Sequence, residues 1–342
     1  MKNKFKSILL RLLTYPSAAY NAVLFQLLHN RRLLRPPYRP MVMDIEPTTY
    51  CNFKCSMCHV SDSDFPHQHM SFELFKSIID SNPQLLKIKL QGMGEPLLCP
   101  DFFAMVEYAR KQHLLVQTTT NGSRLNESNV ERLAKAGLIS IGVSIDGATA
   151  DTFEAIRINS SFQKVTEGVK RLSDSLSAHK TSTILRGWTV LQKANSMEIA
   201  EIVRLSKALG VHEHVFQVFV SSWGKTAWEA KTSQASIDQE LLNKAIQTTT
   251  DEGKKVGLSV KFFYENLYSK NRPCIWPWHS AYVAADGRVV PCCILGDPRV
   301  KALGDLTKES FLHLWKKENY SSFRNLHIAD KIPGFCKSCY RV

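Results

Sequence analysis

Three cysteines stand close together near the start of the chain. Cys51, Cys55 and Cys58 are separated by three and by two residues, and they follow an apolar run, residues 41–45, that predicts a short buried strand. Three thiolates this close do not suit ordinary disulfide geometry. They suit three corners of an iron–sulfur cube whose fourth iron is left open for another ligand. A zinc site is the alternative that the spacing leaves open.

A second group of cysteines lies in the last quarter of the chain. Asp286-Gly287 stands between alternating apolar residues, which predicts a β-hairpin over 282–290 that brings Cys274 and Cys292 towards each other. Four gathered thiolates suit a metal centre, and zinc is again an alternative to iron and sulfur. The cysteines of this group are Cys274, Cys292, Cys293, Cys336 and Cys339.

The distribution of the nine cysteines favours metal ligation over disulfides, because only Cys99 stands outside the two groups. A secretory signal is not expected, since Arg11 interrupts the apolar run of the N-terminus and no small-residue cleavage site follows. Grouped thiols without an export signal predict a reducing compartment, which indicates the cytoplasm.

The net charge of +13 invites a nucleic-acid interpretation, but its distribution argues against one. Residues 1–40 carry eight basic residues and no acidic residue, so this leader holds more than half of the excess. Its apolar residues recur at helical spacing. We expect a helical arm packed on the protein itself; an amphipathic helix on an anionic membrane surface and RNA contact are the alternatives. The basic residues are Lys2, Lys4, Lys6, Arg11, Arg31, Arg32, Arg35 and Arg39.

Strand-like and helix-like patterns alternate from residue 41 to about 220. Serine caps predict helix starts at Ser71, at a Ser128/Glu131 capping box and at a Ser236/Gln239 capping box. Six strand–helix units predict an α/β fold with parallel strands, a partial (β/α)6 TIM-like barrel whose working loops follow the strand ends. The expected strands are 41–46, 85–91, 114–119, 138–145, 183–191 and 214–220.

This pattern predicts four segments. The leader (1–40) precedes the barrel core (41–225); a bridging helix and a strand at 260–264 occupy 226–273; and a small β-hairpin and helix module, with Phe311, Leu314 and Trp315 on one helix face, forms 274–342. At 342 residues the chain is long enough for one large and one small domain.

The spacing of the first three cysteines resembles the radical S-adenosylmethionine (SAM) superfamily. The resemblance implies that the amino and carboxylate groups of SAM chelate the open iron of a [4Fe–4S] cluster. It also extends to residues at later strand ends, although Met93 replaces the first glycine of the family's Gly-Gly-Glu motif. The residues that match cofactor-binding positions are Met57, Gly94, Glu95, Asn121, Ser144, Asp146, Arg157, Leu191 and Asn195.

The resemblance implies a role for each of these positions. Gly94 and Glu95 contact the SAM amino group, whereas Ser144 and Asp146 lie near the ribose and the amino acid moiety. Arg157 pairs with the SAM carboxylate, for which a surface salt bridge is the competing interpretation. Met57 and Leu191 are the apolar neighbours of adenine, and Asn195 is a polar neighbour. Asn121 matches the family's Thr-Asn-Gly segment, although Asn-Gly is also an ordinary turn signal.

The pattern Cys274-x12-Gly287-x4-Cys292 resembles the SPASM/twitch extension of radical SAM enzymes, and most of all the twitch domain of 2-deoxy-scyllo-inosamine dehydrogenase. The resemblance implies a second [4Fe–4S] cluster on Cys274, Cys292, Cys336 and Cys339. Cys293 and Cys99 are then candidate hydrogen-atom donors, with packing as the alternative for both.

The activity that the resemblance implies is reductive cleavage of SAM to a 5′-deoxyadenosyl radical, fed by an external one-electron donor such as flavodoxin or ferredoxin. A fully ligated second cluster favours dehydrogenation of a carbohydrate- or aminocyclitol-like substrate, and a thiol hydrogen donor favours epimerisation. Modification of a ribosomal peptide is the alternative, against which the short leader argues because it is too small for a recognition domain. A lipid-linked substrate and a non-enzymatic zinc or nucleic-acid-binding role complete the alternatives.

Overall fold

The computed structural model describes residues 2–62, 64–263, 268–269 and 272–340. The chain forms two compact units, which are described one at a time. Unit 1 comprises Met1–Tyr50, Pro66–Gln117 and Asn266–Val342, and unit 2 comprises Cys51–Phe65 and Thr118–Glu265. The units are defined by contacts between residues, and neither unit begins or ends at the predicted segment boundaries, residues 40, 225 and 273. The four predicted segments therefore stay predictions.

Unit 1 is built on a mixed sheet with a parallel centre. The strand order is β12-β11-β10-β1-β3-β4; β10, β1, β3 and β4 run parallel, and β11 and β12 are antiparallel. Alternate residues such as Met43 and Ile88 are fully buried, as expected for strands covered by helices. The strands are β1 (Val42–Ile45), β3 (Lys87–Leu90), β4 (Leu115–Thr120, which ends in unit 2), β10 (Ser280–Val283), β11 (Arg288–Val290) and β12 (Gly304–Asp305).

The helices of unit 1 come from three parts of the chain. α3 and α4 connect the central parallel strands, and the C-terminal helices bury Phe311, Leu314 and Trp315, the residues expected on one helix face. Gly287 has φ +87° in the β10–β11 hairpin, a conformation that favours glycine. The helices are α1 (Lys2–Thr14), α2 (Pro16–Leu28), α3 (Phe72–Asp80), α4 (Phe102–Lys111), α11 (Trp276–His279), α12 (Phe311–Lys316) and α13 (Glu318–Ile328).

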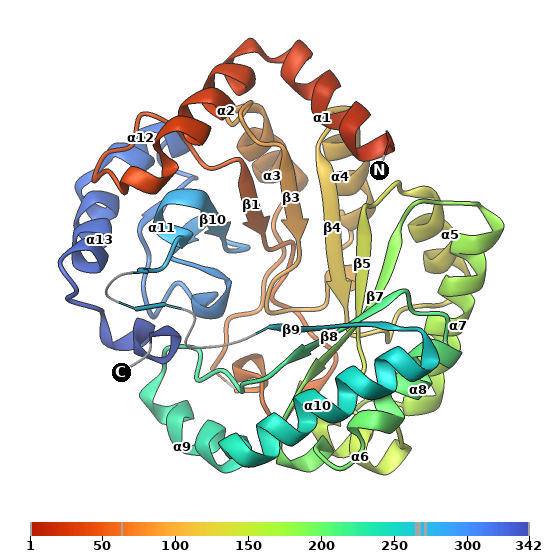
Figure 1. The fold of residues 1–342 in the computed structure, drawn as a ribbon. Coiled ribbons are helices and arrows are strands. Elements are labelled where there is room, and N and C mark those ends of the chain that lie inside the picture. Colours follow the sequence, from red (N-terminus) through yellow and green to blue (C-terminus); the bar gives the residue numbers. More distant parts are fainter. Residues whose placement is uncertain (1, 63, 264–267, 270–271, 341–342) are drawn as a thin grey trace. The chain divides into compact units, whose positions relative to one another are not determined.

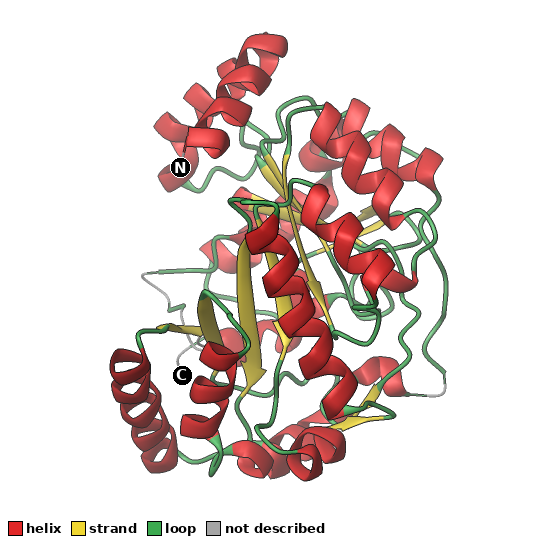
Figure 2. Cartoon of the chain, turned by 90° about the vertical axis from the view of Figure 1, so that its right-hand side faces the viewer, coloured by secondary structure: helices red, strands yellow, loops and turns green. Residues whose placement is uncertain are grey.

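Unit 2 contains parallel strands in the order β5-β7-β8-β9. Figure 2 shows helices lying over one face of long strands. The elements are β2 (Lys54–Cys55), α5 (Glu127–Lys135), β5 (Ser140–Ser144), α6 (Ala150–Ile156), β6 (Arg157–Ile158), α7 (Phe162–Ala178), β7 (Ile184–Val190), α8 (Ile199–Ala208), β8 (Glu213–Gln217), α9 (Thr226–Ala235), α10 (Gln239–Val256) and β9 (Ser259–Phe263).

The predicted fold class is confirmed. Strands β1, β3, β4, β5, β7 and β8 occupy the six predicted positions, and each precedes a helix along the chain (Figure 1). The strand predicted at 260–264 is β9, although Tyr264 lies outside the described residues.

Two of the three predicted helix starts are wrong. Ser71 caps α3 as predicted, accepting a hydrogen bond from Leu74 N at 3.2 Å. However, Asn126 caps α5, which starts earlier than the Ser128/Glu131 box, and Asp238 caps α10. Asn and Asp are strong N-cap residues, and both lie where the chain leaves its extended conformation. Ser236, expected to open α10, instead ends α9.

The leader forms two helices, α1 and α2, broken at Pro16, which has no backbone N–H for a continuing helix. The side chain of Arg11 is only 1% exposed and donates to Leu85 O at 2.9 Å and Gln112 O at 2.7 Å. Later in the leader, Leu34 O accepts from Arg324 Nη1 at 2.9 Å. The leader therefore packs on the rest of unit 1.

No single helix in the described ranges has the length and apolar character needed to cross a bilayer. Phe5–Thr14 and Pro16–Arg31 meet that test only when taken together, and they are bent by 113°.

Replacing Arg11 with methionine should lower the free energy of unfolding by roughly 2–3 kcal/mol, because buried carbonyls that accept from the guanidinium would lose their donor. The measurement is urea unfolding of the full chain. Arg31→Met, at an exposed position, is the matched control and should change stability little. Equal midpoints for the two variants would show that the Arg11 contacts do not anchor the leader.

Candidate functional site

The loop that carries the first three cysteines is held by a short antiparallel ladder within unit 2. β2 pairs with β6 so that Cys55 lies opposite Arg157. Next to this pair, Ser56 N donates to Ile156 O at 3.0 Å, and Cys58 N donates to Cys55 O at 3.1 Å. The loop thus takes its shape from the residues that follow α6, not from its own sequence alone.

Two of the three sulfurs accept hydrogen bonds from predicted site residues. Arg157 Nη1 lies 3.7 Å from Cys55 Sγ, and Asn121 Nδ2 lies 3.7 Å from Cys51 Sγ. Donors directed at sulfur stabilise negative charge there and raise the reduction potential of an iron–sulfur cluster. Asn121 therefore does more than form the Asn-Gly turn.

The third cysteine, Cys58, is partly buried. Burial, together with the nearby Cys55 thiol, raises the pKa of Cys58 to about 12. A thiol in such a place loses its proton when a metal ion takes the proton's position. The donor set, three gathered thiols with N–H groups aimed at two of them, fits the iron–sulfur cluster that the sequence predicts.

A buried ion pair supports this loop. Arg157 Nε binds Asp146 Oδ2, and both residues are buried, so the competing interpretation of Arg157 as a surface salt bridge does not hold. Burial would lower the pKa of Arg157, but the Asp146 carboxylate and the Cys55 sulfur raise it. Asp146 Oδ1 also accepts from Val190 N at 2.6 Å. Asn195 Nδ2 donates to the carbonyls of Asp146 and Val190, both at 3.0 Å.

The structure thus brings Arg157, Asp146 and Asn195 together. Their proposed contacts with SAM stay predictions, because each of these side chains also binds within the protein. Ser144 ends β5 and Leu191 follows β7, and both are buried in unit 2.

Trp223 is a residue of this site that sequence reasoning missed. Its Nε1 donates to the carbonyl of Met57 at 3.1 Å, and its ring stacks on His59 with centroids 4.9 Å apart and planes 3° apart. Its φ is +57°, unusual for a bulky residue and often a mark of functional sites. The position after β8, at the carboxyl end of a parallel strand, is the signal that could have found it.

The glycine loop lies in unit 1. A Cβ at Gly94 would lie 2.4 Å from Thr48 O and 2.6 Å from Tyr50 O, so only glycine fits there. Glu95 N donates at 2.8 Å to the carbonyl of Tyr50, the residue directly before Cys51 in the chain. The Glu95 side chain is buried and accepts from Leu97 N at 3.2 Å. The expected SAM contacts of Gly94 and Glu95 stay predictions.

Glu46 is a second residue that sequence reasoning missed. It follows β1 directly, is 1% exposed, and accepts from Met93 N at 2.6 Å, Tyr282 OH at 3.1 Å and Ala285 N at 3.1 Å. A Cβ at Gly92 would lie 2.3 Å from Glu46 Cγ, so this glycine makes room for the carboxylate. Glu46 joins the glycine loop to the C-terminal hairpin within unit 1.

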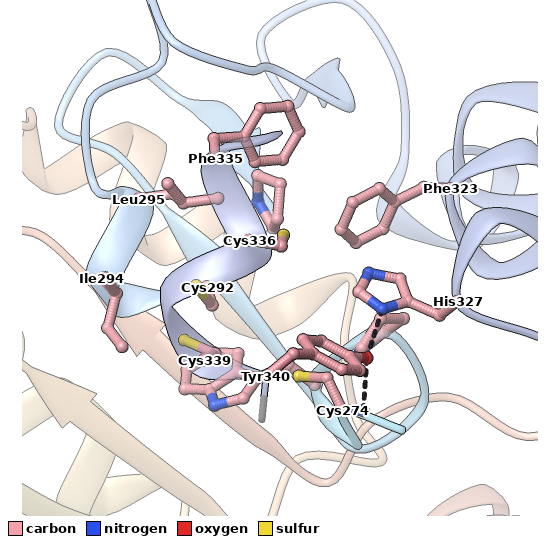
Figure 3. A pocket seen from close by; sticks show the side chains of 13 residues that line it. Cys274, Cys292, Ile294, Leu295, Phe323, His327, Phe335, Cys336, Cys339 and Tyr340 are labelled. Carbon is pink, nitrogen blue, oxygen red and sulfur yellow. Dashed lines mark hydrogen bonds between the residues drawn. The ribbon is translucent and has the colours of Figure 1, made fainter. Parts of the chain in front are cut away.

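The four C-terminal cysteines predicted as ligands line a single pocket in unit 1 (Figure 3). Its volume, including its opening, is about 360 Å³. Cys274, Cys292, Cys336 and Cys339 share it with mostly apolar and aromatic side chains. Burial raises the pKa of Cys274 to about 12, and burial also raises the pKa of Cys292 well above its ordinary value.

Tyr340 closes one side of this pocket. Its hydroxyl accepts from Cys274 N at 2.8 Å and lies 2.7 Å from His327 Nδ1 (Figure 3). No group of metal-ligating side chains among the described residues is spaced for a single ion. A cubane cluster binds each thiolate to a different iron, and four thiols that line one pocket are the donor set such a cluster would take.

Neither of the two candidate hydrogen donors is among the residues that line this pocket. Cys293 packs against Tyr282, Ala284 and Val290, and burial raises its pKa to about 12. Cys99 is buried after the glycine loop. Both positions agree with the packing alternative, and hydrogen donation stays a prediction for both.

Comparison with known proteins agrees with the two sites. Residues 45–192 match the sequence model described as "Radical SAM superfamily", and residues 274–340 match that of the SPASM "Iron-sulfur cluster-binding domain". The chain carries a radical SAM domain and a SPASM domain. These domains imply SAM, a [4Fe–4S] cluster and additional iron–sulfur ligation.

Three similar proteins cover most of the chain. The AdoMet-dependent heme synthase of Methanosarcina barkeri is 27% identical and covers 88% of this chain and 88% of its own length. The mycofactocin maturase MftC of Mycobacterium tuberculosis is 26% identical and covers 88% of this chain and 75% of its own length. The crystal structure of Streptococcus suis SuiB bound to S-adenosylmethionine has a TM-score of 0.69 at 16% identity, and the match covers 88% of this chain and 72% of SuiB. This likeness shows the shared fold.

Replacing Cys51, Cys55 and Cys58 together with alanine should reduce the iron content of the reconstituted chain from about eight to about four per chain, since one of two four-iron clusters would lose its protein ligands. The same should follow from replacing Cys274, Cys292, Cys336 and Cys339. Iron analysis and absorption near the cluster band measure the change. Cys99→Ala should keep the full content. Bound zinc with no iron would contradict the assignment.

Replacing Arg157 with glutamine in an Asp146→Asn background, which avoids an unpaired buried carboxylate, should lower the midpoint potential of the first cluster relative to Asp146→Asn alone, because one N–H···S donor and a positive charge are lost. If the reduced cluster loses about 1.4 kcal/mol more stabilisation than the oxidised cluster, the midpoint potential falls by about 59 mV for one electron. A redox titration followed by EPR measures it. Asp146→Asn alone is the matched control, and an unchanged potential in the double variant would exclude this electrostatic role.

The buried Glu46 should make unfolding stability depend on pH. Burial raises its pKa to about 7 from an ordinary 4.5, so the folded state holds the proton that the unfolded state releases. The resulting stability is present below pH 4.5 and is lost as the pH rises to 7, by up to roughly 3 kcal/mol. Urea unfolding across this range should show a weaker pH slope for Glu46→Gln than for the parent chain. Glu127→Gln, at an exposed site, should keep the parent slope.

Proposed function

We propose that this protein uses SAM, bound at the Cys51–Cys58 loop, to remove a hydrogen atom from an unactivated C–H bond of a peptide side chain. The observation that carries the proposal is the gathering of three thiols in a loop whose sulfurs accept from Arg157 and Asn121. When bound, the cluster and SAM supply the one-electron cleavage of the C5′–S bond that yields methionine and a 5′-deoxyadenosyl radical.

The residues of the chain supply position and electrostatics. Arg157 and Asn121 favour added negative charge on the cysteine sulfurs. Asp146 and Asn195 fix the loop after β7 through the hydrogen bonds to Val190. Trp223 stacks over His59 beside the cysteine loop, which shields this side of the loop from water.

The names of similar proteins support a peptide as the substrate. MftC is a maturase, a 24% identical protein of Gluconobacter oxydans that covers 89% of this chain is a PqqA peptide cyclase, and SuiB has been solved with its precursor peptide SuiA at a TM-score of 0.69. These relatives favour peptide modification over the dehydrogenase or epimerase activity that the twitch resemblance implies.

Oxidation of a carbohydrate- or aminocyclitol-like alcohol is the second candidate, and the C-terminal pocket favours it. Four cysteines line that pocket, so a cubane there would have a protein ligand on every iron and no open iron for substrate. Such a cluster suits electron acceptance from a substrate radical, which dehydrogenation needs. We propose flavodoxin or ferredoxin as the electron donor to the first cluster, in a reducing compartment such as the cytoplasm.

The reconstituted full chain, given SAM and dithionite, should form 5′-deoxyadenosine, whereas Cys55→Ala should form none. The identity of the substrate is tested by adding short precursor-type peptides or, separately, aminocyclitols and sugars carrying deuterium at carbon. Deuterium should appear in 5′-deoxyadenosine with the true substrate class. Transfer from sugars only would favour the second candidate, and a cluster-loaded chain that makes no 5′-deoxyadenosine would refute both.

A further inference from the structure

The two helices of the leader present an apolar stripe to solvent. Its six side chains are between 46% and 70% exposed, although most large apolar side chains in this protein are buried. A contiguous apolar patch on a protein surface marks an interaction site more often than chance exposure does. We call this set the leader stripe: Phe5, Leu9, Leu13, Tyr20, Val23 and Leu27.

The spacing of the stripe places its members on one side of each helix. In α1 they recur every four residues, and in α2 at intervals of three and four, which is the period of one helix face. The other side of each helix is fixed against unit 1. On α1, Arg11 donates to buried carbonyls, and on α2 the ring of Phe25 packs edge-on against His279 with centroids 5.0 Å apart. Asn21 of α2 also exchanges hydrogen bonds with the backbone of Arg39, at the end of the leader, at 3.0 and 2.7 Å. The orientation of the stripe is therefore set by specific polar contacts.

Basic residues accompany the stripe. Lys6, Arg31 and Arg35 are exposed, and the first 40 residues contain eight Lys and Arg but no Asp or Glu. The first acidic residue of the chain is Asp44, which is buried in β1. The leader thus combines exposed apolar groups on α1 and α2 with exposed cations, Lys6 on α1 and Arg31 and Arg35 after α2.

This combination selects one kind of partner. An anionic bilayer surface takes apolar side chains at its acyl boundary and attracts Lys and Arg through its headgroups. A second copy of the chain would bring two sets of exposed cations together, which opposes association. A nucleic acid would use the cations but would leave the apolar stripe in water. We propose that the leader stripe and its exposed cations dock unit 1 on an anionic lipid bilayer.

The test is flotation of the reconstituted full chain with vesicles of phosphatidylcholine alone, or of phosphatidylcholine and phosphatidylglycerol in equal amounts. The chain should float with the anionic vesicles only, and binding should weaken with added salt. Neutralising Lys6, Arg31 and Arg35 with glutamine should weaken binding on the order of 100-fold, from about 1 kcal/mol per basic residue near the surface and 1.4 kcal/mol per factor of ten.

The apolar part of the proposal has its own variant and control. Leu13→Ser, Val23→Ser and Leu27→Ser combined should abolish flotation while keeping the iron content and 5′-deoxyadenosine formation of the parent chain. The matched control replaces three exposed apolar residues elsewhere, Met197, Leu312 and Ile328, with serine, and should float as the parent does. Failure to bind anionic vesicles, or equal binding to both kinds, overturns the proposal. If the parent chain forms a dimer without vesicles and the stripe variant does not, the leader stripe is instead an interface with a second copy of the chain.

Discussion

One buried carboxylate holds the centre of unit 1 together. Glu46 accepts from the glycine loop through Met93 N and from the C-terminal hairpin through Tyr282 OH and Ala285 N. These donors come from two distant parts of the chain. A buried carboxylate is costly unless donors surround it, so the two segments stabilise Glu46 and are positioned by it in return. Glu46 also stands between β1 and the cysteine loop in the chain.

Buried arginines have a comparable structural part. Arg11 joins α1 to carbonyls after α3 and α4, and Arg324 joins α13 to the carbonyls of Pro277, Leu34 and Trp315. Each replaces the water that these carbonyls would otherwise bind, which a guanidinium can do because it offers several N–H groups in fixed directions. Positive charge in this protein therefore serves packing as well as solubility, and the net charge alone says little about partners.

Much of the architecture was predictable because its signals are local. Apolar runs of strand length alternate with helical patterns, and the fold class follows from that alternation. Helix starts were less predictable: Asn126 and Asp238 cap α5 and α10 in place of serine boxes nearby, because several polar residues in each segment could have capped the helix. The break between α1 and α2 needed only Pro16 to be anticipated.

The site was predictable in its residue types and less so in its contacts. Cysteine spacing pointed to both thiol groups, whereas the pairing of Arg157 with Asp146 and Cys55 depends on a strand pair that only the fold creates. Trp223 and Glu46 were missed because single aromatic or acidic residues after strands are common, and only tertiary contacts distinguish them. Tyr340 likewise acquires its place from His327 and Cys274, which no short motif connects.

The ladder between β2 and β6 has a consequence for how the protein is made. Cys55 and Arg157 are 102 residues apart in the chain, so the cysteine loop cannot take its final shape until residues well beyond it have left the ribosome. The C-terminal pocket needs Cys274 and Tyr340 together, and is complete only near the end of synthesis. The residues that shape the first loop therefore leave the ribosome before those that complete the second pocket.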